Sequence, residues 1–201
     1  IKAVQWMSEE TKMQALKKLD TMVVKIGYPD KWKDYSNYTI QSKEEGGSIV
    51  PAVEMIRTQE LQEEMAQLKN PFDKSQFGMP AHMVNAYYNP QQNKIVFPAA
   101  ILQAPFYSLE QSSSANYGGI GAVIAHEISH AFDTNGASFD EHGSLKNWWT
   151  DEDFAAFKTR TDKVVDQFDG LDSYGAKVNG QLTVSENVAD LGGVACALEA
   201  A

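Results

Sequence analysis

Residues 126–130 read His126-Glu127-Ile128-Ser129-His130, and this stretch decides how the rest of the chain is interpreted. On an α-helix, residues four positions apart point the same way, so His126 and His130 could hold one metal ion together. Glu127 lies about 100° further round the helix axis, beside that ion. The pattern is typical of zinc hydrolases, in which two imidazoles bind the metal and the carboxylate acts as a general base.

The residues before this stretch favour a buried helix. Residues 117–125 are small or apolar, as expected for a helix within a core. The alternative, two solvated histidines that happen to lie one turn apart, leaves this flank unexplained. We therefore predict a helix over residues 116–132, ended by a turn at Asn135-Gly136.

A catalytic zinc site needs a third protein ligand and leaves its fourth position to water. His82 and His142 lie in turn-like surroundings and are interpreted as solvated or packing residues. Glu186 and Asp190 are better placed, because they share one face of a second predicted helix that Ser185 would cap. Glu186 would bind zinc, and Asp190 would accept the outer N–H of a ligating imidazole. Without the histidine motif, the same two carboxylates would indicate a solvated helix face.

Several further motifs follow one another in the order of a known peptidase family. They are Asn85-Ala86-Tyr87-Tyr88, residues 95–103, residues 116–121, Trp148-Trp149 and Glu186-Asn187-Val188-Ala189-Asp190. Together with the His126 motif, they resemble the neprilysin and endothelin-converting-enzyme family, in particular its bacterial, PepO-like branch. The match is dense from about Asn85 to the end of the chain.

The resemblance implies a zinc endopeptidase with one Zn²⁺ per chain, bound by His126, His130 and Glu186. Glu127 would activate the zinc-bound water for attack on a peptide bond, and the substrates would be oligopeptides. The family's carboxylates that orient the zinc ligands correspond to Asp190 and Asp133.

The resemblance also implies how a substrate is held. Asn85 and Ala86 match residues of an edge strand that binds the substrate backbone by strand addition. Ile101, Phe106 and Val123 match apolar positions near the pocket for the residue that follows the cut, so cleavage before hydrophobic residues is expected. Ordinary core packing explains these three residues equally well.

The implied fold is α+β and mainly helical: a single thermolysin-like (gluzincin) catalytic domain over residues 1–201. Alternating apolar residues at 84–88 and 94–97 predict a small antiparallel β element, a hairpin beside the active-site helix. Further helices are predicted over residues 8–26, 49–69 and 150–168.

Capping and stop signals set the ends of these helices. Ser8 would begin the first helix and Gly27 would end it, and Asn70-Pro71 would end the second. Trp148 and Trp149, before the third, are expected to pack in the core.

Family members carry a large helical lobe and, beyond the glutamate helix, a histidine that stabilises the oxyanion and an arginine that binds the substrate. Residues 1–201 do not supply them, so we expect a fragment or a miniature form. Two hypotheses follow: an active endopeptidase, or a zinc-binding but catalytically impaired fragment with a structural or regulatory role. A metal-free helical domain with a chance motif is a third.

Composition narrows the class of partner. A formal net charge of −10 argues against nucleic acid, which demands a basic surface. No stretch approaches the roughly 20 apolar residues that a membrane-spanning helix needs. The single cysteine, Cys196, excludes an internal disulfide, which fits a bacterial protein of either the cytoplasm or the periplasm.

Overall fold

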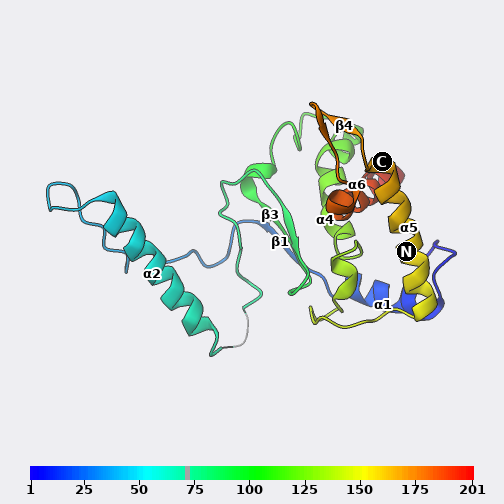
Figure 1. The fold of residues 1–201 in the computed structure, drawn as a ribbon. Coiled ribbons are helices and arrows are strands. Elements are labelled where there is room, and N and C mark those ends of the chain that lie inside the picture. Colours follow the sequence, from blue (N-terminus) through cyan, green and yellow to red (C-terminus); the bar gives the residue numbers. More distant parts are fainter. Residues whose placement is uncertain (71–72) are drawn as a thin grey trace. The chain divides into compact units, whose positions relative to one another are not determined.

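The computed structural model describes residues 1–70 and 73–201. These residues form two compact units, one of residues 1–28 with 77–201 and one of residues 29–76. Each unit is built around its own helices (Figure 1). The candidate site residues all lie in the larger unit.

The larger unit contains a three-stranded sheet with the order β1-β3-β2. The central strand β3 (Lys94–Pro98) is buried along its whole length. It pairs antiparallel with β2 (Tyr87–Asn89) and parallel with β1 (Val23–Gly27). The predicted hairpin is therefore confirmed, and it leaves β2 as an edge strand.

The prediction of one helix over residues 8–26 was wrong after Asp20. Helix α1 (Glu9–Asp20) begins as expected, with the Ser8 side chain accepting a hydrogen bond from the Thr11 backbone N–H. The chain then enters β1, whose Val23, Val24 and Ile26 are β-branched and suit a pleated strand better than a helix. Pairing with β3 supplies the backbone hydrogen bonds that a longer helix would have supplied.

The histidine motif lies at the end of a nearly continuous helical segment. It comprises α3 (Ser113–Asn116), a π-helical turn η2 (Tyr117–Gly121) and α4 (Ala122–Ser129). The predicted helix over residues 116–132 is thus present but ends about three residues early. A short 3-10 helix, η3 (Gly136–Ser138), follows at the predicted turn.

Two long helices complete this unit. Helix α5 (Asp151–Phe168) is capped by Thr150, at the predicted helix start. A small hairpin of β4 (Asp172–Ser173) and β5 (Ala176–Lys177) then leads to α6 (Gly180–Ala200). Among the described residues, no helix is long and apolar enough to span a membrane, α6 included. In the centre of the unit, α4 packs against β2 and against α6 (Figure 1).

Ser185 does not cap a helix, contrary to the prediction. Helix α6 starts earlier, where the side chain of Asn179 accepts a hydrogen bond from the Leu182 backbone N–H at 2.9 Å. Asn179 therefore supplies the cap. Ser185 lies inside the helix, which leaves its hydroxyl free for a tertiary contact.

The core of the larger unit lies between the sheet and the helical segment that carries the histidine motif. Its buried members come from β3, from the residue before β2, from the turn after β3 and from η2: Ala86, Ile95, Phe97, Ile101 and Ile120. A second, aromatic cluster surrounds Trp149, which is buried, stacks on Trp6 and Phe157, and donates its indole N–H to the Ala137 carbonyl. The expected core role of Trp149 is confirmed.

The smaller unit, residues 29–76, contains the helix α2 (Ile49–Gln67). Within this unit, Lys33 forms ion pairs with Glu60 and Glu63, two acidic residues of α2. The predicted helix over residues 49–69 is confirmed to within two residues. Pro71, to which its end was assigned, lies outside the described residues.

Candidate active site

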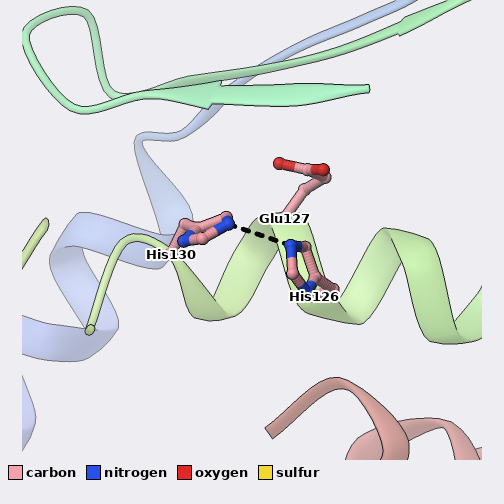
Figure 2. Close-up of side chains that lie close together, drawn as sticks. All are labelled: His126, Glu127 and His130. Carbon is pink, nitrogen blue, oxygen red and sulfur yellow. Dashed lines mark hydrogen bonds between the residues drawn. The ribbon is translucent and has the colours of Figure 1, made fainter. Parts of the chain in front are cut away.

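Helix α4 brings three polar side chains of the motif together. The Nε2 atoms of His126 and His130 face each other at 2.9 Å (Figure 2). Glu127 projects toward the hairpin strands instead and is only 6 % exposed. Donor atoms of all three residues lie within 4.8 Å of one another. The helical spacing thus produces the cluster that the sequence predicts.

Helix α6 adds a third donor from the opposite side. Glu186 Oε2 lies 3.5 Å from the Nε2 atoms of both His126 and His130. With these two nitrogens it forms a triangle whose centre is about 1.9 Å from each corner, close to the roughly 2.0–2.2 Å bonds that zinc makes to such ligands. The donor set of two imidazoles and one carboxylate therefore fits a zinc ion.

Two further carboxylates set the tautomers of the histidines. Asp190 Oδ1 lies 2.7 Å from His126 Nδ1, and Asp133 Oδ2 lies 2.7 Å from His130 Nδ1. Because an ionised carboxylate can only accept, each Nδ1 carries the proton and each Nε2 presents a lone pair. Two lone pairs that face each other at 2.9 Å repel unless a cation or a shared proton lies between them. The arrangement is suited to a bound metal ion.

Asp133 is held by a network of donors. Its Oδ1 accepts from the backbone N–H groups of Asn135 (2.7 Å) and Gly136 (2.6 Å), and its Oδ2 also accepts from the Ser185 hydroxyl (2.5 Å). Burial alone would raise the pKa of Asp133, but these bonds and the one from His130 hold that pKa below its usual value. Burial would likewise lower the pKa of His130, and Asp133 instead raises it.

Glu127 has the environment of a general base. Burial raises the pKa of its carboxyl, and Glu186 adds to this effect. The pKa is lowered in turn by His130, His126 and the Tyr88 backbone N–H, but these groups do not cancel the effect of burial. A raised pKa brings the group nearer to neutral pH, where a base can both accept and release a proton.

A glycine in α6 allows the two ligand-bearing helices to approach closely. A Cβ atom on Gly193 would lie 2.9 Å from the backbone N of His126 and from the carbonyl O of Ala122. Such contacts with backbone are not tolerated, so any larger residue would push α6 away from α4. This glycine therefore sets the distance across which Glu186 and Asp190 reach the histidines.

The hairpin forms the other wall of a cleft of about 500 Å³. Asn85, Ala86 and Tyr88 line this cleft together with the histidine motif and Glu186. The Asn85 carboxamide oxygen accepts a hydrogen bond from the Ala86 backbone N–H. The two residues expected to hold a substrate backbone thus lie in the same cleft as the candidate metal ligands.

The three residues expected near the substrate pocket pack in or against the apolar core. Ile101 belongs to the buried core cluster, and Phe106 and Val123 pack against it. None of them is among the residues that line the cleft. His82 and His142 are also absent from the cleft lining. The Nε2 atom of His142 lies 3.3 Å from Glu141 Oε1 instead.

Sequence reasoning missed the residues that support Asp133. Ser185 was interpreted as a helix cap and Asn135 as a turn residue, yet Asn135 Nδ2 donates to Ser185 Oγ at 3.2 Å and both contact Asp133. The only available signal was the short polar side chain of Ser185 next to Glu186. Such a residue is more often a cap than a tertiary contact.

The fold and the donor set together define a class, the thermolysin-like zinc peptidases, and comparison with known proteins specifies the family. The chain is 61 % identical over 196 residues to a Streptococcus gordonii protein assigned as a zinc metalloproteinase, covering 98 % of this chain and 34 % of the relative. It is 50 % identical over 196 residues to the neutral endopeptidase of Lactobacillus helveticus, and the match covers 97 % of this chain and 30 % of the relative. The crystal structure of PepO from Lactobacillus rhamnosis HN001 superimposes with a TM-score of 0.91 at 45 % identity, covering 98 % and 31 %.

The model of Peptidase family M13 matches residues 85–201, and the chain belongs to this family. The family resemblance and the α+β, thermolysin-like fold expected from the sequence are confirmed. The chain spans about a third of the length of these relatives.

Proposed function

We propose that this chain is the zinc-binding catalytic domain of an endopeptidase that hydrolyses oligopeptides. The proposal rests mainly on one observation: the donor atoms of His126, His130 and Glu186 converge on one point, and Glu127 lies beside it. The names of the relatives, a zinc metalloproteinase and a neutral endopeptidase, support it.

In this proposal, His126, His130 and Glu186 hold a single zinc ion. When bound, zinc lowers the pKa of water to about 7 and polarises a carbonyl group. Glu127 accepts the proton of the attacking water and passes it to the leaving amine, a role that its raised pKa favours. The Glu127 carboxylate is buried and projects toward the hairpin side of the cleft (Figure 2).

Asp190 and Asp133 are proposed to orient the imidazoles. Each keeps the Nδ1 proton of its histidine in place, so that the Nε2 lone pairs stay directed at the metal position. Restricting the ligands before the metal arrives lowers the cost of binding it.

The hairpin is proposed to hold the peptide substrate. One edge of β2 pairs with β3, and residues next to its start, Asn85 and Ala86, line the cleft. An extended peptide could therefore add as a further strand, with its backbone bound by these residues. A preference for cleavage before hydrophobic residues is proposed from the family resemblance alone, since Ile101, Phe106 and Val123 do not line the cleft.

The proposal is tested by cleavage of a mixed peptide library in the presence and absence of a chelator. The products are identified by mass spectrometry. The wild-type protein should bind one zinc ion per chain and cleave before hydrophobic residues. Glu127→Gln should retain the zinc and lose activity by about 10³-fold. His126→Ala serves as the control that loses the metal.

A second candidate function is a zinc-binding domain without turnover of its own. It is favoured by the fact that the chain spans only about a third of its relatives, so that groups needed for catalysis can lie outside it. This candidate would be supported if the wild type binds one zinc ion per chain but cleaves peptides no faster than Glu127→Gln does. If the wild type binds no more zinc than His126→Ala does, both proposed functions are wrong.

A further inference from the structure

Lys18 is a buried cation with no part in the chemistry described so far. It lies near the end of α1 and is 1 % exposed. Its ammonium group donates to three backbone carbonyls, those of Ala131, Gly136 and Phe139, at 2.7 Å each. An ammonium group has three N–H donors, so this geometry satisfies all of them.

Lys18 stays mainly charged at neutral pH, although burial disfavours its charged form. The rings of Tyr88, Phe132 and Trp148 lie 5.8–6.0 Å from Nζ, within the range of cation–π attraction. Burial lowers the pKa of Lys18 to about 8, while Asp133 and Asp140 act in the opposite direction. At neutral pH the side chain is therefore mainly protonated and keeps its three donors.

The three carbonyls belong to one loop, residues 131–139, that presents Asp133 to His130. Ala131 directly follows His130, and α1 lies beside this end of α4 (Figure 2). Gly136 donates its own N–H to Asp133 Oδ1, so the residue whose carbonyl binds Lys18 also donates to the carboxylate, through the preceding peptide group. Ala131 follows the end of α4, where carbonyls lack partners within the helix, and the Lys18 ammonium group supplies one. The Gly136 carbonyl accepts from the Phe139 backbone N–H as well as from Lys18.

The position of Lys18 is itself held by the hairpin. The Asn93 side chain donates to the Lys18 carbonyl at 2.8 Å and accepts from the Tyr88 hydroxyl at 3.0 Å. Asn93 is fully buried and adopts a left-handed backbone conformation with φ 46°. Tyr88 itself lines the cleft together with Glu127 and Asp133. The network thus connects Lys18 with both sides of the cleft.

We propose that Lys18 is a positioning residue of the metal site, which holds the loop of residues 131–139 so that Asp133 keeps His130 directed at the zinc position. This inference rests on the proposed function. A simpler account is that Lys18 only anchors α1 to the rest of the unit. The two accounts differ in whether loss of Lys18 changes the metal site of the folded protein.

Helix α1 supplies a matched control at its other end. Thr11 is fully buried, like Lys18, and its hydroxyl donates to Asp153 Oδ2 at 2.6 Å. Asp153 lies at the start of α5 and is not among the residues that line the cleft. Thr11→Val therefore removes a buried anchor of the same helix without touching the loop of residues 131–139.

The experiment compares Lys18→Met, Lys18→Arg and Thr11→Val by zinc affinity, measured by competition with a chelator at a temperature where all variants are folded. Hydrogen exchange of the Asn135 and Gly136 amides reports on the loop. Lys18→Met should bind zinc about tenfold more weakly and exchange both amides faster, because it disturbs the support of a ligand. Lys18→Arg should recover part of the affinity, and Thr11→Val should lower only the melting temperature.

Equal zinc affinity and equal amide exchange in Lys18→Met and the wild type would overturn the inference, as would an equal loss in Thr11→Val. If Lys18→Met does not fold, Lys18→Gln, which keeps two N–H donors, takes its place under the same criteria. If the wild type binds no zinc, the proposed function fails, whereas the amide exchange still decides whether Lys18 holds the loop.

Discussion

Asp133 and Asp190 make the same contact with a candidate zinc ligand in very different surroundings. Each lies 2.7 Å from the Nδ1 atom of its histidine. The Asp133 side chain is 2 % exposed and accepts three further hydrogen bonds, whereas the Asp190 side chain is 73 % exposed. Asp133 is three residues from His130, and Asp190 is 64 residues from His126.

The difference shows that equal distances do not imply equal restraint. A buried carboxylate with several donors keeps one orientation, because any other would leave those donors unpaired. An exposed carboxylate competes with water and is screened by salt. We therefore expect the network at Asp133 to restrain its histidine more strongly than the exposed contact at Asp190.

The largest effect is expected from Asp133→Ala. The change leaves His130 without its partner and the Ser185 hydroxyl and two backbone N–H groups without an acceptor. Zinc affinity should fall by about 100-fold, and the free energy of unfolding should fall by about 3 kcal/mol. Chelator competition and thermal unfolding measure the two quantities.

A smaller effect is expected from Asp190→Ala. Zinc affinity should fall by about tenfold, while stability should change by less than about 0.5 kcal/mol, because the side chain is largely exposed. If Asp190→Ala weakens zinc binding as much as Asp133→Ala does, the proposed difference in restraint between the two carboxylates is wrong.

Ser185→Ala should sharpen the comparison by removing one donor of the Asp133 network and nothing from Asp190. A weakening of zinc binding by about threefold is expected, the equivalent of one hydrogen bond of modest strength. Thr183→Ala is the matched control, since the Thr183 hydroxyl donates to the Asn179 carbonyl within α6. Both variants are measured by chelator competition, and an equal loss in Thr183→Ala would contradict a role for Ser185.

The smallest effect is confined to acid pH in the metal-free protein. The folded pKa of Asp133 lies below its ordinary value of 3.8, so its ionised form stabilises the fold above that pH. This contribution is lost as the pH falls through the folded pKa. Asp133→Asn should therefore show a shallower loss of stability on acidification than the wild type, in denaturant titrations at several pH values. An unchanged acid dependence would contradict the network.

Local patterns predicted most of the elements correctly. The hairpin, α2, α5 and the helix of the histidine motif follow from periodicity and from caps such as Thr150, which act within a few residues. The prediction failed at β1, where an apolar run suited both a helix and a strand. Pairing with β3, about 70 residues away, decided between them.

The sequence by itself determined that His126, Glu127 and His130 form one cluster, because four-residue spacing on a helix requires no other part of the chain. It also indicated Glu186 and Asp190 as partners, since they share a helix face. Only the tertiary structure decided that Ser185 and Lys18 surround Asp133, because their contacts join segments 52 and more than 100 residues apart. Such contacts depend on how α1, α4 and α6 pack, and packing over these separations leaves no period in the sequence.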